Sequence, residues 1–184
     1  MLNQIKGLHS VTSMAADAQE NNDFFTKLPG LRRVKKTVSF DAPDVYHLCY
    51  GDEAGTPGSV MTCFPFPHVV KGCRGTGEVS ETVFAVPEGA LGGWKERFGN
   101  HGVTGLQEHE QFGEKRLRFL GPEGDGFALA EAPGDLRAPF ARGPVPADVG
   151  IHGFRGVTML LRDGAATAEL LRFMGYEEAD RQGA

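Results

Sequence analysis

The side chains best suited to bind a metal or a polar ligand are scattered along this chain of 184 residues. His9 lies near the amino terminus, and the run VYHLCYGD contains Tyr46 and His47 side by side. Arg74 precedes a glycine-rich turn, where its guanidinium could hold a carboxylate or a phenolate. Tyr46, His47 and Arg74 are therefore candidates to line a ligand pocket. Two simpler interpretations stay open: His47 as a packed strand residue and Arg74 as a solvated loop residue.

Several classes of function find no support in the sequence. The chain contains no GxSxG, no phosphate-binding loop and no dinucleotide fingerprint. Its formal net charge of −5 lacks the basic excess of a nucleic-acid-binding surface, and no run approaches the roughly 18 apolar residues of a membrane span. Cys49, Cys63 and Cys73 form no CxxC pair. We therefore expect reduced thiols in a cytoplasmic protein, with neither nucleic acid nor membrane as a partner.

The elements that would position these residues follow a repeated order. Residues 8–15 alternate like a strand, Asp17 is a suitable N-cap, and the following helix should end at the LPGL turn. Three strand-like runs follow, separated by the turn signals APD and DEAGTPG. A second round repeats the order strand, helix, strand, strand, strand, with a helix that its glycines weaken.

A third round begins at residue 152 and stops after its helix. GLHSVT aligns with GFRGVT, so Gly7 corresponds to Gly153, and farther along Phe24 corresponds to Leu170. We predict an α+β protein made of two full βαβββ modules and the start of a third. The expected units are a first module at residues 1–70, a second at 76–133, a proline- and glycine-rich linker at 134–151 and a partial third module at 152–184.

The repeated βαβββ unit resembles the vicinal-oxygen-chelate superfamily, which includes glyoxalases, bleomycin-resistance proteins and extradiol dioxygenases. The runs GLHSVT, VKKTVSFDAPDVYHLCYGDEAGTPG and GFRGVT resemble, within it, the ring-cleaving dioxygenases that act on hydroquinones. This resemblance implies mixed sheets that curl into open half-barrels, a small aromatic ligand, and an oxidoreductase that uses Fe(II) or another divalent metal. Proteins of this branch contain about four modules, so the chain resembles their amino-terminal half with a partial third module.

The metal ligands that the resemblance implies are a histidine in the first strand and a histidine and a glutamate from the fourth module. Such a triad leaves coordination positions open for substrate and O₂. Here Ser10 takes the position of the first histidine, Arg155 replaces the corresponding histidine of the third module, and a fourth module is absent. His9 is the remaining metal candidate, but it would need a register slip or a bulge because neighbouring strand residues face opposite sides. Glu131 is likewise one position from the expected glutamate site.

Three hypotheses of function stay open. The chain could be a ring-cleaving dioxygenase relative that is inactive alone and needs another chain or a bound metal to complete its site. It could instead be a metal-free protein that binds a small molecule, with Ser10 among the pocket residues, or a fragment of a four-module dioxygenase. No catalytic residue is assigned. For all three we expect a homodimer, or pairing of modules between chains, in which two first modules meet across a two-fold axis.

Overall fold

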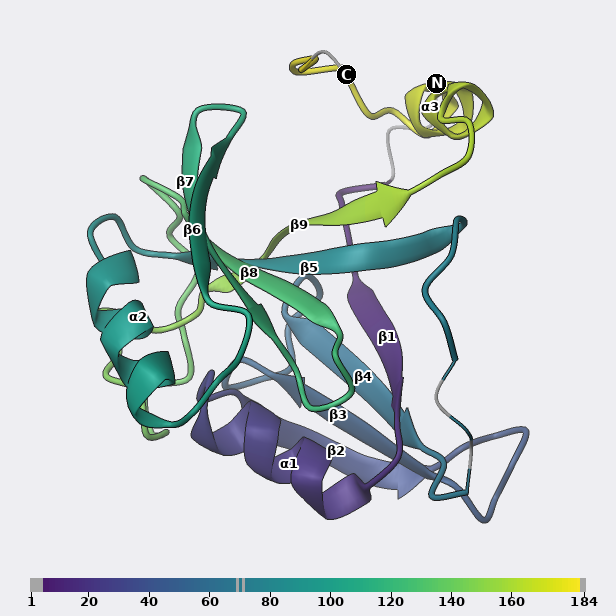
Figure 1. Ribbon diagram of the computed structural model, residues 1–184, viewed down its shortest axis with the longest axis vertical. Coiled ribbons are helices and arrows are strands. Elements are labelled where there is room, and N and C mark those ends of the chain that lie inside the picture. Colours follow the sequence, from purple (N-terminus) through teal and green to yellow (C-terminus); the bar gives the residue numbers. More distant parts are fainter. Residues whose placement is uncertain (1–4, 69, 71, 183–184) are drawn as a thin grey trace.

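The first module forms a four-stranded mixed sheet with one helix (Figure 1). This computed structural model describes residues 5–68, 70 and 72–182. The elements of the first module are β1 (Ser10–Ala15), α1 (Ala18–Lys27), β2 (Arg32–Val38), β3 (Tyr46–Gly51) and β4 (Val60–Pro65). Their order in the sheet is β1-β4-β3-β2, with β1 parallel to β4 and the other pairs antiparallel.

The second module repeats this topology in a five-stranded sheet. Its elements are β5 (Glu78–Val86), α2 (Leu91–Asn100), β6 (Gln107–Gln111), β7 (Glu114–Leu120) and β8 (Gly126–Glu131), followed by β9 (Gly153–Leu160) and α3 (Ala165–Phe173) of the third round. The order is β6-β7-β8-β5-β9, with β5 parallel to β8 and antiparallel to β9. The predicted α+β class and the open mixed sheets are confirmed, and the first strand of the third round joins the second module.

Backbone conformation reproduces the internal repeat. Gly7, which precedes β1, and Gly153, which begins β9, correspond in the repeat and have φ angles of 136° and 137°. Gly30 and Gly175, which follow corresponding helices, both have positive φ as well. L-residues rarely adopt such angles, which explains why glycine occupies both copies of each position. At Gly153 a Cβ would also lie 2.7 Å from the carbonyl oxygen of Gly58, so the third-round strand packs closely on the first module.

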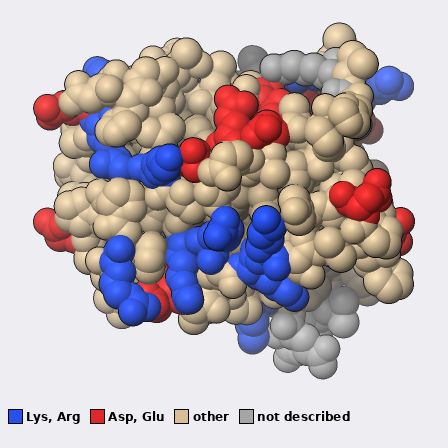
Figure 2. Space-filling model, turned by 90° about the horizontal axis from the view of Figure 1, so that it is seen from below, with Lys and Arg blue, Asp and Glu red and all other residues tan. Residues whose placement is uncertain are grey.

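The outer edge of the first sheet is basic. β2 forms this edge and carries Arg32, Arg33, Lys35 and Lys36. Figure 2 shows Lys and Arg side chains gathered on the face seen from below, the side on which β2 lies in Figure 1. Charged side chains on an edge strand oppose pairing with another strand. The basic run LRRVKKT is therefore explained as a protected sheet edge.

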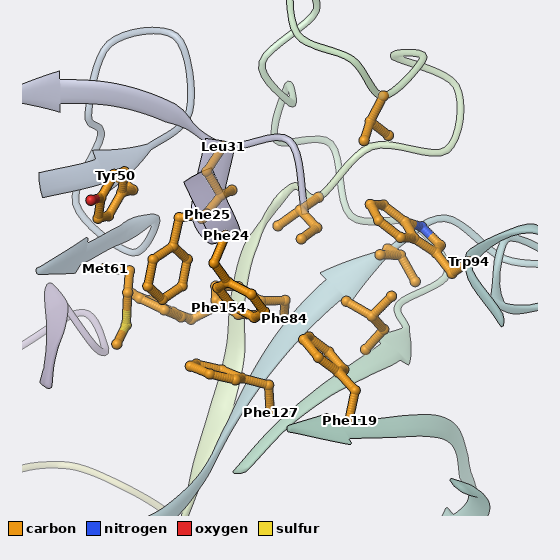
Figure 3. Close-up of a cluster of buried hydrophobic side chains, with 14 of the residues drawn as sticks. Phe24, Phe25, Leu31, Tyr50, Met61, Phe84, Trp94, Phe119, Phe127 and Phe154 are labelled. Carbon is orange, nitrogen blue, oxygen red and sulfur yellow. The ribbon is translucent and has the colours of Figure 1, made fainter. Parts of the chain in front are cut away.

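One hydrophobic core joins both modules (Figure 3). Phe24 and Phe25 of α1 contact Phe127 of β8, with ring centroids 5.9 and 5.8 Å apart. Segment 134–151 contains no helix or strand, yet its Val145 and Ile151 are buried in the same core. None of the helices in the described part of the chain is long and apolar enough to cross a membrane. Each sheet therefore has one face on the shared core and one face turned away from it, the core-distal face.

Candidate functional site

Ser10, which takes the position of the expected first metal ligand, lies on the core-distal face of the first sheet. Because strand residues alternate, this face carries the residues between those that enter the core. Register places these side chains in three rows that cross from β1 toward β3: Ser10 with Val60; Thr12 with Thr62 and Cys49; and Met14 with Phe64 and His47. The Thr12 and Thr62 hydroxyls lie 2.8 Å apart within hydrogen-bonding distance. The face thus combines two hydroxyls with an apolar patch.

These residues do not fit a divalent metal. The Ser10 hydroxyl is neutral, and strand spacings put Ser10 and His47 about 16 Å apart, far beyond what one ion can bridge. His9 lies just before β1 with an exposed side chain, and its carbonyl oxygen accepts from the Gly58 amide at 2.8 Å. The β1–β4 register runs without a bulge from Ser10 onward. No group of three His, Cys, Asp or Glu side chains able to hold a metal occurs among the residues described.

His47 is packed as an aromatic strand residue. Its ring stacks on Phe64 with centroids 4.3 Å apart, and its buried Nε2 has no hydrogen-bond partner within the described residues. Burial lowers the pKa of His47, and the positive charge of Lys35 lowers it further. The imidazole is therefore held in its neutral form over a wider pH range than a free histidine.

The other two pocket candidates lie elsewhere. Tyr46 precedes His47 on the strand and therefore points to the opposite face, where the Lys36 ammonium lies 4.1 Å from its ring centroid. Arg74 donates to the carbonyl oxygens of Ser80 and Gly124, at 3.2 and 2.5 Å. Its guanidinium thus ties the loop before β5 to the β7–β8 turn. Of the four residues, the structure places only Ser10 and His47 on one face, at opposite ends.

Sequence reasoning missed a buried carboxylate in the second module. The amides of Phe66 and Ala132 donate to Ala15 and Val86, which makes Ala15 and Val86 equivalent residues of their modules. Counting back five residues from each makes Glu81 the equivalent of Ser10. Glu81 is only 3% exposed and accepts from Arg118 Nε at 2.6 Å. A charged residue inside the apolar run of β5 was the available signal.

His109, on the core-distal face of the second sheet, is also affected by burial. Burial lowers the pKa of His109, while the charge of Glu81 opposes that shift. Glu131, the carboxylate next to the expected glutamate position, accepts from the Gly89 amide at 2.9 Å and caps the loop before α2. It therefore does not join the face to which Ala130 belongs, as alternation along the strand predicts.

The antiparallel pair of strands β5 and β9, here called the β5–β9 seam, is related locally by an approximate two-fold axis. Thr82 pairs with Val157 at its centre, and both correspond to Val11 in the module repeat. In the first module the matching edge of β1 has no strand partner within residues 5–68, 70 and 72–182. The face that carries Ser10 therefore borders an open edge.

Comparison with known proteins gives a consistent picture. MhqO of Bacillus subtilis (strain 168), named as a ring-cleaving dioxygenase, is 37% identical over 184 residues, which is 100% of this chain and 59% of MhqO. MhqE of the same organism, with the same designation, is 40% identical over 166 residues, covering 90% of this chain and 54% of its own. The chlorohydroquinone/hydroquinone 1,2-dioxygenase of Sphingobium indicum is 37% identical over 162 residues, 86% of this chain and 50% of its own.

Solved structures agree with these sequence matches. The crystal structure of a protein named as a dioxygenase from Bacillus subtilis superposes with a TM-score of 0.91 and 38% identity, over 96% of this chain and 57% of that chain. A glyoxalase family protein from Enterococcus faecalis shares the fold, with a TM-score of 0.55 and 15% identity over 68% of this chain and 98% of its own. A scan against models of known protein families gave no match.

The chain spans between 50% and 59% of the length of the curated relatives named above. Within that span, the whole sequence and the whole βαβββ repeat match proteins named as ring-cleaving dioxygenases. The chain is therefore a relative of proteins named as ring-cleaving dioxygenases, and it has the fold of the glyoxalase/bleomycin-resistance, or vicinal-oxygen-chelate, proteins.

Proposed function

We propose that this chain serves the ring cleavage of hydroquinone-type aromatic compounds, and that the metal ligands of that reaction come from outside the chain. Similarity over its whole length to proteins named for this chemistry is the observation that carries the proposal. Ser10 supports the second part, because a neutral hydroxyl stands where the resemblance requires an imidazole. The residues described hold no other set of ligands.

The chain's own residues would bind and orient the aromatic ring. Met14, Phe64 and the edge of His47 offer an apolar surface for it, and the Thr12 and Thr62 hydroxyls could hydrogen-bond a phenol. The completing residues would join along the open edge of β1, which borders this face. In solutions of the chain alone, a second copy would pair with that edge.

The test is to mix this chain with a separately expressed carboxyl-terminal part of MhqO, the part that follows its match to this chain. Oxygen uptake with Fe(II) and hydroquinone is measured for each piece and for the mixture. We expect uptake only from the mixture. A complex that forms and holds iron but consumes no oxygen would overturn the proposed chemistry.

Iron content separates the two parts of the proposal. After anaerobic loading with Fe(II) and desalting, the chain alone should retain far less than one iron per chain. Near-stoichiometric iron that is lost in His9→Ala would place a ligand inside the chain and contradict an external site. His101→Ala is the matched control, since His101 lies on the other module at the end of α2.

The second candidate function is that of a metal-free protein that binds a small molecule. Ser10 favours it as much as it favours external metal ligands, because a protein that binds no metal needs no imidazole at this position. The two candidates differ in what iron does. Hydroquinone that binds the chain alone, with an affinity unchanged by Fe(II) and by the MhqO part, would favour the binding protein. Isothermal titration with and without both additions makes this distinction.

A further inference from the structure

A separate cavity of about 460 Å³ lies on the core-distal face of the second sheet, across the β5–β9 seam. Its floor is made by Val83 and Gly156, which are direct cross-strand neighbours. Gly156 has no side chain, which leaves space above this part of the floor. Neither Ser10 nor any other residue of the proposed dioxygenase face lines this cavity.

On one polar side of the cavity, two guanidinium groups share a single carboxylate. The Arg116 side chain is only 10% exposed and donates to Gln111 Oε1 at 2.7 Å and to Glu114 Oε2 at 2.8 Å. The other oxygen of Glu114 accepts from Arg155 Nε at 2.7 Å. Its buried Nε leaves Arg116 one donor without a partner among the described residues. One carboxylate thus serves two cations, and each guanidinium has five N–H groups to offer.

A strained aromatic residue stands at the rim. Phe112 has a φ of 52° and is followed by Gly113 with a φ of 73°, in the two-residue turn between β6 and β7. Such a turn favours Asn, Asp or Gly at its first position, because an ordinary side chain is strained there. Phe112 gains no core burial in exchange, since it is 43% exposed, but it lines the cavity. A costly aromatic ring beside a cavity indicates a ligand that it contacts.

We propose that this cavity binds a small planar carboxylate, with the flat part of the ligand against Phe112 and its carboxylate on Arg155 and Arg116. Guanidinium groups match carboxylates in geometry and charge, and an aromatic ring stacks best on a planar group. Asp180 of the carboxyl-terminal segment also lines the cavity. Its negative charge repels that of the ligand, so Asp180 weakens the binding of any anion. The site is independent of the proposed dioxygenase function.

Benzoate is the probe, and isothermal titration measures its affinity for the whole chain. Two comparison compounds define the ligand class: cyclohexanecarboxylate keeps the charge without the planar ring, and benzamide keeps the planar ring without the negative charge. We expect benzoate to bind at least about tenfold more tightly than either, since each lacks one of the two contacts.

Phe112→Asn and Arg155→Gln should each weaken benzoate binding by about tenfold or more, and Asp180→Asn should strengthen it. Phe112→Asn also suits the turn, so its Tm should be equal to or above that of the wild type. Lost binding in this variant can then not be attributed to unfolding. Arg142→Gln is the matched control, because Arg142 pairs with Glu53 away from the cavity.

Three results would overturn the site: no benzoate binding by the wild type at millimolar concentration, unchanged binding in Phe112→Asn and Arg155→Gln, or equally tight binding of cyclohexanecarboxylate. Thr12→Val, a change on the other sheet, should leave benzoate binding unchanged. Failure of this site is therefore distinguishable from failure of the dioxygenase proposal, which depends on iron, oxygen and the first sheet.

Discussion

The proposal that the metal ligands lie outside this chain depends on single residues of the first sheet. The sequence motif GLHSVT was sufficient to predict that Ser10 stands in the ligand position and that His9 is out of register. The β1–β4 pairing is unbroken from Ser10 onward, so it contains no bulge that would bring His9 into the position of Ser10. The surroundings of His47 were not predictable, because Phe64 comes from another strand and the stacking depends on how β3 and β4 pair.

The titration of His47 is the first prediction at this scale. Burial and Lys35 lower its pKa below the ordinary 6.5. The folded chain therefore binds fewer protons than the unfolded chain as pH falls below 6.5. Stability contributed by neutral His47 is present above that pH and is lost as pH falls through the lowered pKa. Lys35→Met should move the pKa of His47 back toward its ordinary value, as measured by NMR titration of the imidazole.

Lys27→Met is the control for this change, because Lys27 pairs with Asp23 on α1 and is not a cause of the His47 shift. An equal change in the pKa of His47 after both substitutions would show that the net charge of the chain, rather than the neighbouring ammonium of Lys35, lowers this pKa. No response to either would leave burial as the whole cause.

At the level of elements, periodicity and turn signals predicted every helix and strand of the two modules. Their limits are visible in α2, which forms despite three glycines. Leu91, Trp94 and Phe98 are buried on one side of α2, and this packing outweighs the weak propensity. Segment 134–151 shows the converse, because local composition gave no sign that Val145 and Ile151 would enter the core.

Corresponding positions on α1 and α3 give a prediction about elements. Phe24 and Leu170 align in the repeat, but Phe24 is 8% exposed and Leu170 is 57% exposed. Phe24→Ala should cost about 3–5 kcal/mol in the free energy of unfolding, because it opens a cavity in the shared core. Leu170→Ala should change that free energy by no more than about 0.5 kcal/mol. Urea denaturation of both variants measures the difference.

A large cost for Leu170→Ala would mean that something covers α3 in solution. Repeating the measurement at several protein concentrations shows what contacts α3. A loss of unfolding free energy that grows with concentration indicates another copy of the chain. A loss that does not change with concentration contradicts the exposed position of the helix.

At the scale of the whole molecule, the edges of the two sheets indicate where a second copy of the chain could pair. The outer strands β2 and β6 carry several charges, whereas β1 reads SVTSMA and carries none. An uncharged, unpaired edge is prone to accept another strand. The β5–β9 seam shows the pairing that two first strands of a module adopt, antiparallel about Thr82 and Val157. Only an antiparallel pairing of this kind lets two identical edges meet across a two-fold axis.

We therefore predict a homodimer in which β1 pairs with β1 of a second copy. In the β5–β9 seam Glu81 faces Thr158, so the equivalent register puts Ser10 opposite Thr12 of the partner. Ser10→Cys with Thr12→Cys, in a Cys73→Ser background, should form disulfide-linked dimers on mild oxidation, because directly paired residues meet the Cα spacing that a disulfide needs.

Two controls decide whether this register is the one adopted. Ser10→Cys alone should not cross-link, since its copies are offset by two residues, and Lys36→Cys on the charged edge of β2 should not cross-link either. Non-reducing gels and sedimentation measure both outcomes. A monomer at tens of micromolar, or equal cross-linking through Lys36→Cys, would refute pairing through β1. A dimer that the carboxyl-terminal part of MhqO dissociates would indicate that both partners compete for the same edge, because that part would then occupy the strand position that the second copy leaves.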